Sequence, residues 1–208
     1  LGETEFMGLC FKLNENTLIP RPETEEVVMR VVNSGICMPA RLLDIGTGSG
    51  CIAIALAKQM EGLEAEGVDI SLEAVRQAKE NARINGVTVD FYVRDILRWK
   101  EENWPVYDVI VSNPPYVRFS ERQFMHNRVL NYEPERALFV SDEDPLVFYR
   151  TIADFAMSHL KSGGALFFEI NEALGNEMVN LLSEMAYEGI KIEQDIHGKD
   201  RILWAKKR

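Results

Sequence analysis

The sequence contains few of the residues that build metal centres or disulfide frameworks. It has 3 cysteines and 3 histidines in 208 residues. The cysteines are Cys10, Cys37 and Cys51. Their odd number and their spacing fit neither a disulfide scaffold nor a zinc motif, and indicate reduced thiols in a cytoplasmic protein. The histidines lie far apart in the chain, so we expect no metal site and no catalytic triad.

The chain also lacks long apolar runs and an excess of basic residues. No apolar run reaches the ~18 residues that a membrane-spanning helix needs, and no basic stretch precedes an apolar one at the start, as in a signal peptide. The 23 Lys and Arg residues against 33 Asp and Glu residues give a formal charge of −10. This sign disfavours a nucleic-acid backbone as partner. We expect a cytoplasmic monomer without membrane contact or direct nucleic-acid contact.

Short apolar strands alternate with amphipathic helices along the chain. Strands are expected at 41–45, 66–70, 87–93, 106–112 and 165–170, and helices at 22–32, 51–60, 71–85, 145–160 and 171–187. This order predicts an α/β fold, a doubly wound and mostly parallel sheet. Two further hairpins are predicted: one at the N-terminus over 5–19, turning at 14–16, and one at the sheet edge formed by 190–196 and 201–206. The connection 117–144 carries one short predicted helix, at 121–129.

Three acidic residues are expected at the carboxyl edge of this sheet. Asp44 precedes the turn Gly46-Thr47-Gly48, whose glycines let a ligand approach the backbone at a helix N-terminus. Asp69 ends the next strand 25 residues later, where a carboxylate typically binds ribose hydroxyls. Asp95 follows the third strand and is placed to accept an adenine amino group, with Ile96 against the ring. The pattern therefore predicts an adenosine site at the ends of the strands.

The stretch Asn113-Pro114-Pro115-Tyr116 follows the strand 106–112 directly. The two prolines stiffen the turn and offer carbonyl acceptors without N–H donors. The Asn113 side-chain oxygen and the Pro114 carbonyl are suited to hold an NH2 group, and Tyr116 offers a flat face to a planar group. An ordinary strand-ending turn is the alternative.

A second proline-flanked cluster, Pro20 to Glu26, opens the helix at 22–32. Pro22 suits the first turn of a helix, and carboxylates suit its positive end. Arg21 and Glu23 are therefore either a charged helix start or the wall of a binding site.

With these motifs the chain resembles the class I S-adenosylmethionine-dependent methyltransferases, and within them the protein-glutamine N5-methyltransferases that modify peptide chain release factors. The stretches that carry the resemblance are Leu18–Glu25, Leu43–Gly50, Val68-Asp69, Asp95, Ser112–Tyr116, Tyr132–Leu138 and Gly198–Arg201. The Asn-Pro-Pro-Tyr motif is shared with adenine-N6 DNA methyltransferases, and a sister group modifies a ribosomal protein. Both stay open as alternatives, as does a cofactor-binding module without catalysis.

The resemblance implies roles for individual residues. Bound S-adenosylmethionine is expected to contact Asp44, Ile45, Gly46, Thr47, Gly48, Asp69, Asp95, Ile96 and Asn113. Catalysis is assigned to Asn113, Pro114 and Tyr116, and the substrate is expected to contact Arg21, Glu23, Asn113, Pro114, Pro115 and Tyr116. The expected division is a hairpin and helix at 1–35 packed on a methyltransferase domain at 36–208, with a helical substrate-binding domain upstream of this chain.

Overall fold

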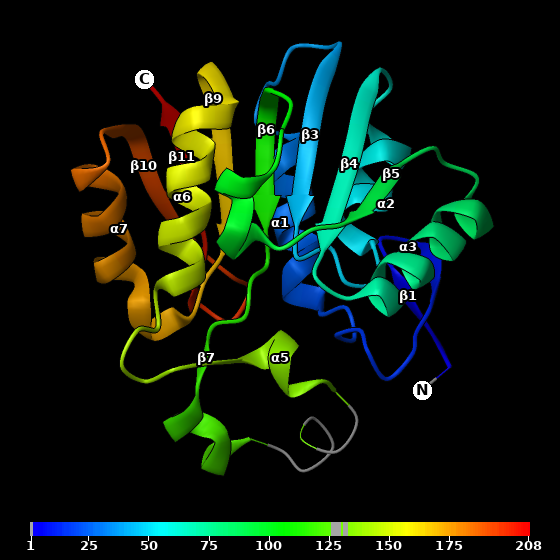
Figure 1. Ribbon diagram of the computed structural model, residues 1–208, viewed down its shortest axis with the longest axis horizontal. Coiled ribbons are helices and arrows are strands. Elements are labelled where there is room, and N and C mark those ends of the chain that lie inside the picture. Colours follow the sequence, from blue (N-terminus) through cyan, green and yellow to red (C-terminus); the bar gives the residue numbers. More distant parts are fainter. Residues whose placement is uncertain (1, 126–129, 131–132) are drawn as a thin grey trace.

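The computed structural model of the chain describes residues 2–125, 130 and 133–208. Its centre is a seven-stranded sheet with the order β10-β11-β9-β6-β3-β4-β5 (Figure 1). The strands are β3 Ala40–Ile45, β4 Leu63–Asp69, β5 Asp90–Val93, β6 Tyr107–Ser112, β9 Leu160–Glu169, β10 Tyr187–Gln194 and β11 Asp200–Lys207. From β9 to β5 the neighbouring strands are parallel, whereas β11 is antiparallel to β9 and to β10. The predicted fold class and its C-terminal edge hairpin are confirmed.

Helices cover both faces of the sheet, and a separate apolar core fills the space on each side. The helices are α1 Pro22–Val32, α2 Cys51–Gln59, α3 Leu72–Asn85, α6 Val147–His159 and α7 Gly175–Glu184, with 3-10 helices η1 Ile96–Glu101 and η3 Glu172–Leu174. Helices α1, α2 and α3 pack on one face together with the N-terminal hairpin, and α6 and α7 pack on the other. Both faces of β3 and β6, at the centre of the sheet, are buried, which explains their continuous apolar runs.

Local signals set the helix ends where the sequence predicts them. Pro22 begins α1, and α3 begins after Ser71, whose side chain accepts a hydrogen bond from the Ala74 N–H. Gly86 ends α3 with a φ of 63°, a conformation that glycine adopts without strain.

The N-terminal hairpin is present, but its predicted turn is wrong. Strands β1 Glu3–Phe6 and β2 Leu9–Lys12 are joined at Met7 and Gly8, which both have positive φ. A two-residue turn of this kind matches the twist of the strands. Asn14 instead forms a local turn beyond β2, in which its side chain accepts from the Asn16 N–H at 2.8 Å. Asparagine often supports such a turn outside hairpins.

The connection after β6 lies below the carboxyl ends of the parallel strands (Figure 1). Its elements are β7 Val117–Arg118, 3-10 helix η2 Phe119–Phe124, α5 Glu135–Leu138 and β8 Phe139–Val140. The helix predicted at 121–129 overlaps η2, and its remainder at 126–129 lies outside the described residues. Strand β9 begins at Leu160 rather than at 165, and its pairing with β6 is irregular between Leu160 and Ala165.

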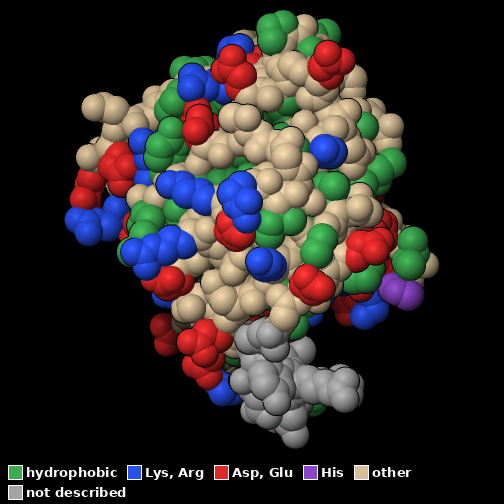
Figure 2. Space-filling model, turned by 90° about the vertical axis from the view of Figure 1, so that its right-hand side faces the viewer, with side chains coloured by type: hydrophobic (Ala, Val, Ile, Leu, Met, Phe, Trp, Pro, Cys, Tyr) green, Lys and Arg blue, Asp and Glu red, His purple; other side chains and the backbone are tan. Residues whose placement is uncertain are grey.

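Charged side chains of both signs are mixed on the surface. Figure 2 shows Lys and Arg side chains lying among Asp and Glu side chains on the α3 side of the molecule. On α3, Arg76 pairs with Glu73 at 2.7 Å and Arg83 with Glu80 at 2.8 Å. Within the described ranges, none of the helices is both long enough and apolar enough to span a bilayer.

Candidate active site

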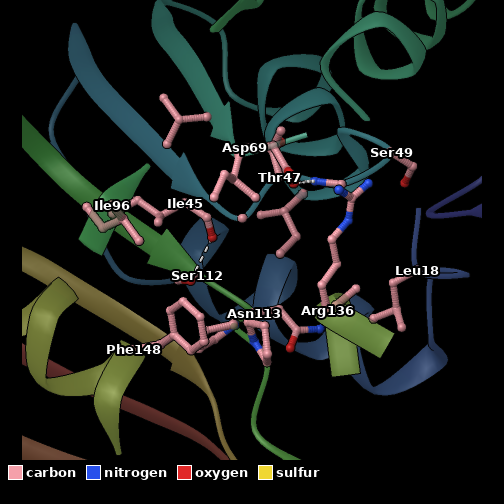
Figure 3. A pocket seen from close by; sticks show the side chains of 18 of the residues that line it. Leu18, Ile45, Thr47, Ser49, Asp69, Ile96, Ser112, Asn113, Arg136 and Phe148 are labelled. Atoms are coloured by element: carbon pink, nitrogen blue, oxygen red, sulfur yellow. Dashed lines mark hydrogen bonds between the residues drawn. The ribbon is translucent and has the colours of Figure 1, made fainter. Parts of the chain in front are cut away.

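A cavity of about 310 Å³ opens at the carboxyl ends of the parallel strands. Its volume lies in the range of small-molecule sites. The residues that line it include Ile45, Gly46, Thr47, Gly48, Asp69, Asp95, Ile96, Asn113, Pro114 and Pro115. The structure thus brings most of the residues singled out in the sequence to one place, and Figure 3 shows the labelled side chains around a common space. Ligands of doubly wound sheets bind in this position.

The glycine-rich turn forms one wall of the cavity. Gly46 and Gly48 have φ values of 73° and 54°. A Cβ added at Gly48 would meet no atom within 4 Å, so this part of the backbone faces open space. Asp44 is fully buried beneath the turn and accepts a 2.6 Å hydrogen bond from the Thr47 hydroxyl. It braces the turn without lining the cavity.

Burial raises the pKa of Asp44 to about 7, against the opposing hydrogen bonds from Thr47 and the Ala53 backbone. Asp69 lies at the end of β4 and does line the cavity. Its two oxygens accept from the Gly48 N–H at 3.0 Å and the Ser71 N–H at 2.9 Å. Burial raises the pKa of Asp69 as well, opposed by these backbone hydrogen bonds and by Arg136.

The Arg136 side chain extends from α5 toward Asp69 and Thr47 (Figure 3). Its guanidinium donates to the Ser71 hydroxyl at 2.8 Å and to Asn16 Oδ1 at 3.2 Å. The connection after β6 therefore places a positive charge beside the acidic end of β4.

The part of the cavity near η1 is mostly apolar. Asp95 precedes η1, and its Oδ1 accepts from the Leu97 N–H at 2.9 Å. Ile96 is buried behind it, and Phe148 of α6 lies across the space (Figure 3). An apolar slot with one carboxylate at its edge is suited to a planar base that carries an amino group.

Asn113 lies between the cavity and α1. Ser112, just before it, donates to the Ile45 carbonyl at 2.7 Å and ties β6 to β3. Asn113 Nδ2 donates to the Thr24 hydroxyl oxygen at 3.3 Å. Among the described residues no donor bonds Asn113 Oδ1 or the Pro114 carbonyl oxygen, so both stay available as acceptors.

Three of the other predicted site residues do not line this cavity. The Tyr116 hydroxyl points to β9 and donates to Glu169 Oε1 at 2.9 Å, where burial raises the pKa of Tyr116. Arg21 pairs with the buried carboxylate of Glu133 at 2.5 Å. Glu23 lies two positions after Arg21, on the first turn of α1, and is half-buried.

Sequence reasoning missed several residues of the site. The missed residues that line the cavity include Asn16, Leu18, Pro20, Thr24, Arg136 and Phe148. None of these residues directly follows a predicted parallel strand, which was the criterion used to predict the site. Thr24 lies inside the charged cluster at the start of α1. Its hydroxyl, a polar group that can hydrogen-bond, was the one feature of the sequence that could have pointed to a site role. The position of Phe148 follows from how α6 packs on the sheet, which the sequence pattern does not specify.

The residues present fit S-adenosylmethionine. The open glycine turn leaves backbone space for its amino-acid portion, Asp69 carries a carboxylate for ribose hydroxyls, and the slot at Asp95 and Ile96 suits adenine.

A parallel sheet with these groups at its carboxyl edge is the arrangement of class I methyltransferases. Residues 26–138 match the family model described as Methyltransferase small domain. A methyltransferase from Pyrococcus furiosus has the same fold, with a TM-score of 0.70 at 18% identity, covering 96% of this chain and 89% of that chain. The chain is thus a methyltransferase of the Rossmann-like type.

Two curated relatives give a narrower assignment. The release factor glutamine methyltransferase of Flavobacterium psychrophilum is 46% identical over 207 residues, which cover 98% of this chain and 72% of that protein. The protein of the same name from Bacteroides thetaiotaomicron is 46% identical over 204 residues, covering 98% and 73%. This chain belongs to the release factor glutamine methyltransferase family.

Proposed function

We propose that the chain transfers a methyl group from S-adenosylmethionine to the side-chain amide nitrogen of a glutamine in a peptide chain release factor. The observation that carries this proposal is the shared cavity: Asn113 and Pro114 present free acceptor oxygens where Asp69, Asp95 and the glycine turn meet. Family membership supports the glutamine as acceptor, since the relatives are named for it.

The difficulty of the reaction lies in the nucleophile. An amide nitrogen is weakly nucleophilic because its lone pair is delocalised into the carbonyl group. In the proposed pose, Asn113 Oδ1 and the Pro114 carbonyl accept the two N–H bonds of the substrate amide. Two fixed acceptors orient the nitrogen, favour its pyramidal form and stabilise the positive charge that develops on its hydrogens. The fixed φ angles of both prolines hold the Pro114 carbonyl in place.

The opposite wall of the cavity holds the methyl donor. When bound, S-adenosylmethionine would supply its sulfonium methyl group: the S–CH3 bond breaks as the N–CH3 bond forms, and the nitrogen then loses one proton. We assign the ribose hydroxyls to Asp69, the adenine amino group to Asp95 and the adenine ring to Ile96. Thr47 and Asp44 keep the turn from Gly46 to Gly48 in shape through their 2.6 Å hydrogen bond.

The substrate is a protein, and it must approach from the side of the cavity where the connection after β6 lies. We propose that Arg21, which precedes α1, and Glu23, on its first turn, contact the release factor near the target glutamine. In this proposal the hairpin and helix at 1–35 pack on a methyltransferase domain at 36–208, which holds both the methyl donor and the acceptor amide.

The Asn113→Ala variant tests the proposed acceptor. We expect at least ~100-fold slower methyl transfer to the glutamine, because the variant loses an interaction that positions the nucleophile. Cofactor affinity, measured by titration calorimetry, should stay within about threefold of the parent. Asn103→Ala, an exposed asparagine outside the cavity, is the matched control. Transfer by Asn113→Ala within threefold of the parent would refute the assignment.

A further inference from the structure

A buried carboxylate behind the active site remains without a role in the mechanism above. Glu169 ends β9 and is 1% exposed. Its Oε2 accepts from the Thr24 hydroxyl at 2.6 Å and its Oε1 from the Tyr116 hydroxyl at 2.9 Å. Glu169 does not line the cavity, so it has no direct access to a bound substrate.

These contacts determine where the Thr24 hydroxyl proton points. An ionised carboxylate accepts hydrogen bonds and donates none. The single proton of the Thr24 hydroxyl is therefore used by Glu169, and Thr24 Oγ1 can only accept a further hydrogen bond. Burial raises the pKa of Glu169, and Glu23 adds to this effect, whereas the hydrogen bonds from Thr24 and Tyr116 and the positive charge of Arg201 oppose it and favour the ionised form.

The orientation of the Asn113 amide follows from this. Only the NH2 end of that amide can face an oxygen that accepts, and Nδ2 does face Thr24 Oγ1, at 3.3 Å. The opposite end, Oδ1, is then directed away from Thr24 and stays free as an acceptor. If Thr24 could donate to Asn113, the Asn113 amide could turn by 180° and present its NH2 group to the substrate. The N–H donors of the substrate amide would then face another donor and be repelled.

We infer that Glu169 is a positioning residue that, through the Thr24 hydroxyl, holds the Asn113 amide with its oxygen free for the substrate. This inference rests on the proposed function of Asn113.

The same carboxylate connects two of the motifs singled out in the sequence. Thr24 belongs to the cluster at the start of α1, and Tyr116 ends the Asn-Pro-Pro-Tyr stretch. Arg201, from the C-terminal hairpin, is held by Asp195 at 3.2 Å and by the Ile170 carbonyl at 3.3 Å. Two segments that are distant in the sequence therefore meet at Glu169, and Arg201 adds a positive charge that acts on it.

Substitutions at Thr24 provide the decisive test. Thr24→Val keeps the shape and removes the hydroxyl, so the Asn113 amide loses its orientation and kcat should fall at least ~10-fold. Thr24→Ser keeps the hydroxyl and should stay within about threefold of the parent. The cofactor dissociation constant should change by less than about threefold in both, because the change lies on the substrate side.

Glu169→Gln provides the second measurement. A glutamine amide offers one acceptor and one donor, so either Thr24 or Tyr116 must reverse its hydroxyl. We expect kcat at least ~5-fold below that of the parent, and the double variant with Thr24→Val should lose little more than the worse single variant. Glu66→Gln is the control, since Glu66 is a buried carboxylate on β4 that accepts from the Tyr107 hydroxyl at 3.0 Å, outside the cavity.

Each outcome separates the inference from the function on which it rests. Absence of glutamine methylation by the parent chain would contradict the proposed function itself. With an active parent, equal kcat values for Thr24→Val and Thr24→Ser would overturn the positioning role. An effect of Glu169→Gln no larger than that of Glu66→Gln would overturn it as well. Circular dichroism and cofactor titration check that each variant is folded.

Discussion

Replacing Asp44 by Asn should change how the stability of the protein depends on pH. Burial raises the pKa of Asp44 from 3.8 to about 7 in the folded state. A carboxyl group with a raised folded pKa stabilises the fold fully below pH ~4, and this contribution is lost as the pH rises to about 7. Over the two pH units from 5 to 7, at ~1.4 kcal/mol per unit, the loss amounts to about 3 kcal/mol. Asparagine does not titrate and escapes this loss.

The measurement is urea unfolding of the parent and of Asp44→Asn at pH 5 and pH 8. The free energy of unfolding of the variant, relative to that of the parent, should rise by about 3 kcal/mol between the two conditions. Asp108→Asn is the control. Despite partial burial, the Lys161 ammonium and the Arg41 N–H lower the pKa of Asp108, so its titration ends below pH 5. A relative stability of Asp44→Asn that is the same at pH 5 and pH 8 would refute the argument from burial.

Two further substitutions test the packing of β4 and the proposed ribose site. In Gly67→Ala the new Cβ would lie 2.6 Å from the Phe91 ring and 2.8 Å from Thr47 Oγ1, so the free energy of unfolding should fall by about 1–3 kcal/mol in urea titrations. Gly2→Ala, whose Cβ would meet no atom within 4 Å, should be neutral, and equal effects of both would contradict the packing argument. Asp69→Asn should raise the Kd for S-adenosylmethionine about 10-fold in calorimetry, and an unchanged Kd would remove Asp69 from the ribose site.

The elements with strong local signals were predictable from the sequence. Helix α1 begins at Pro22 and ends at Val32 as expected, and α3 lies between Ser71 and Gly86 as their capping preferences require. The parallel order of the sheet followed from the alternation of strands and helices. Because parallel strands align their carboxyl ends, the cofactor side of the site could also be anticipated.

The substrate side depends on long-range contacts that no local pattern contains. Thr24 and Glu169 are 145 positions apart, and only the packing of α1 against the end of β9 brings their oxygens within 2.6 Å. Another long-range contact sets the position of Tyr116, which was predicted to offer a flat face to a planar group. Its hydroxyl donates to Glu169, and its side chain does not line the cavity. The hairpin turn at Met7 and Gly8 was missed because the asparagines at 14–16 gave a stronger, but local, turn signal.

A labelled-methyl transfer assay on the 208-residue chain tests the central proposal most directly. Peptide chain release factor, ribosomal protein and adenine-containing DNA are offered side by side with S-adenosylmethionine that carries a labelled methyl group. We expect label in the release factor alone, located on a glutamine side-chain nitrogen by mass spectrometry and lost in the Asn113→Ala variant. Label in DNA or in the ribosomal protein, with none in the release factor, would contradict the proposal.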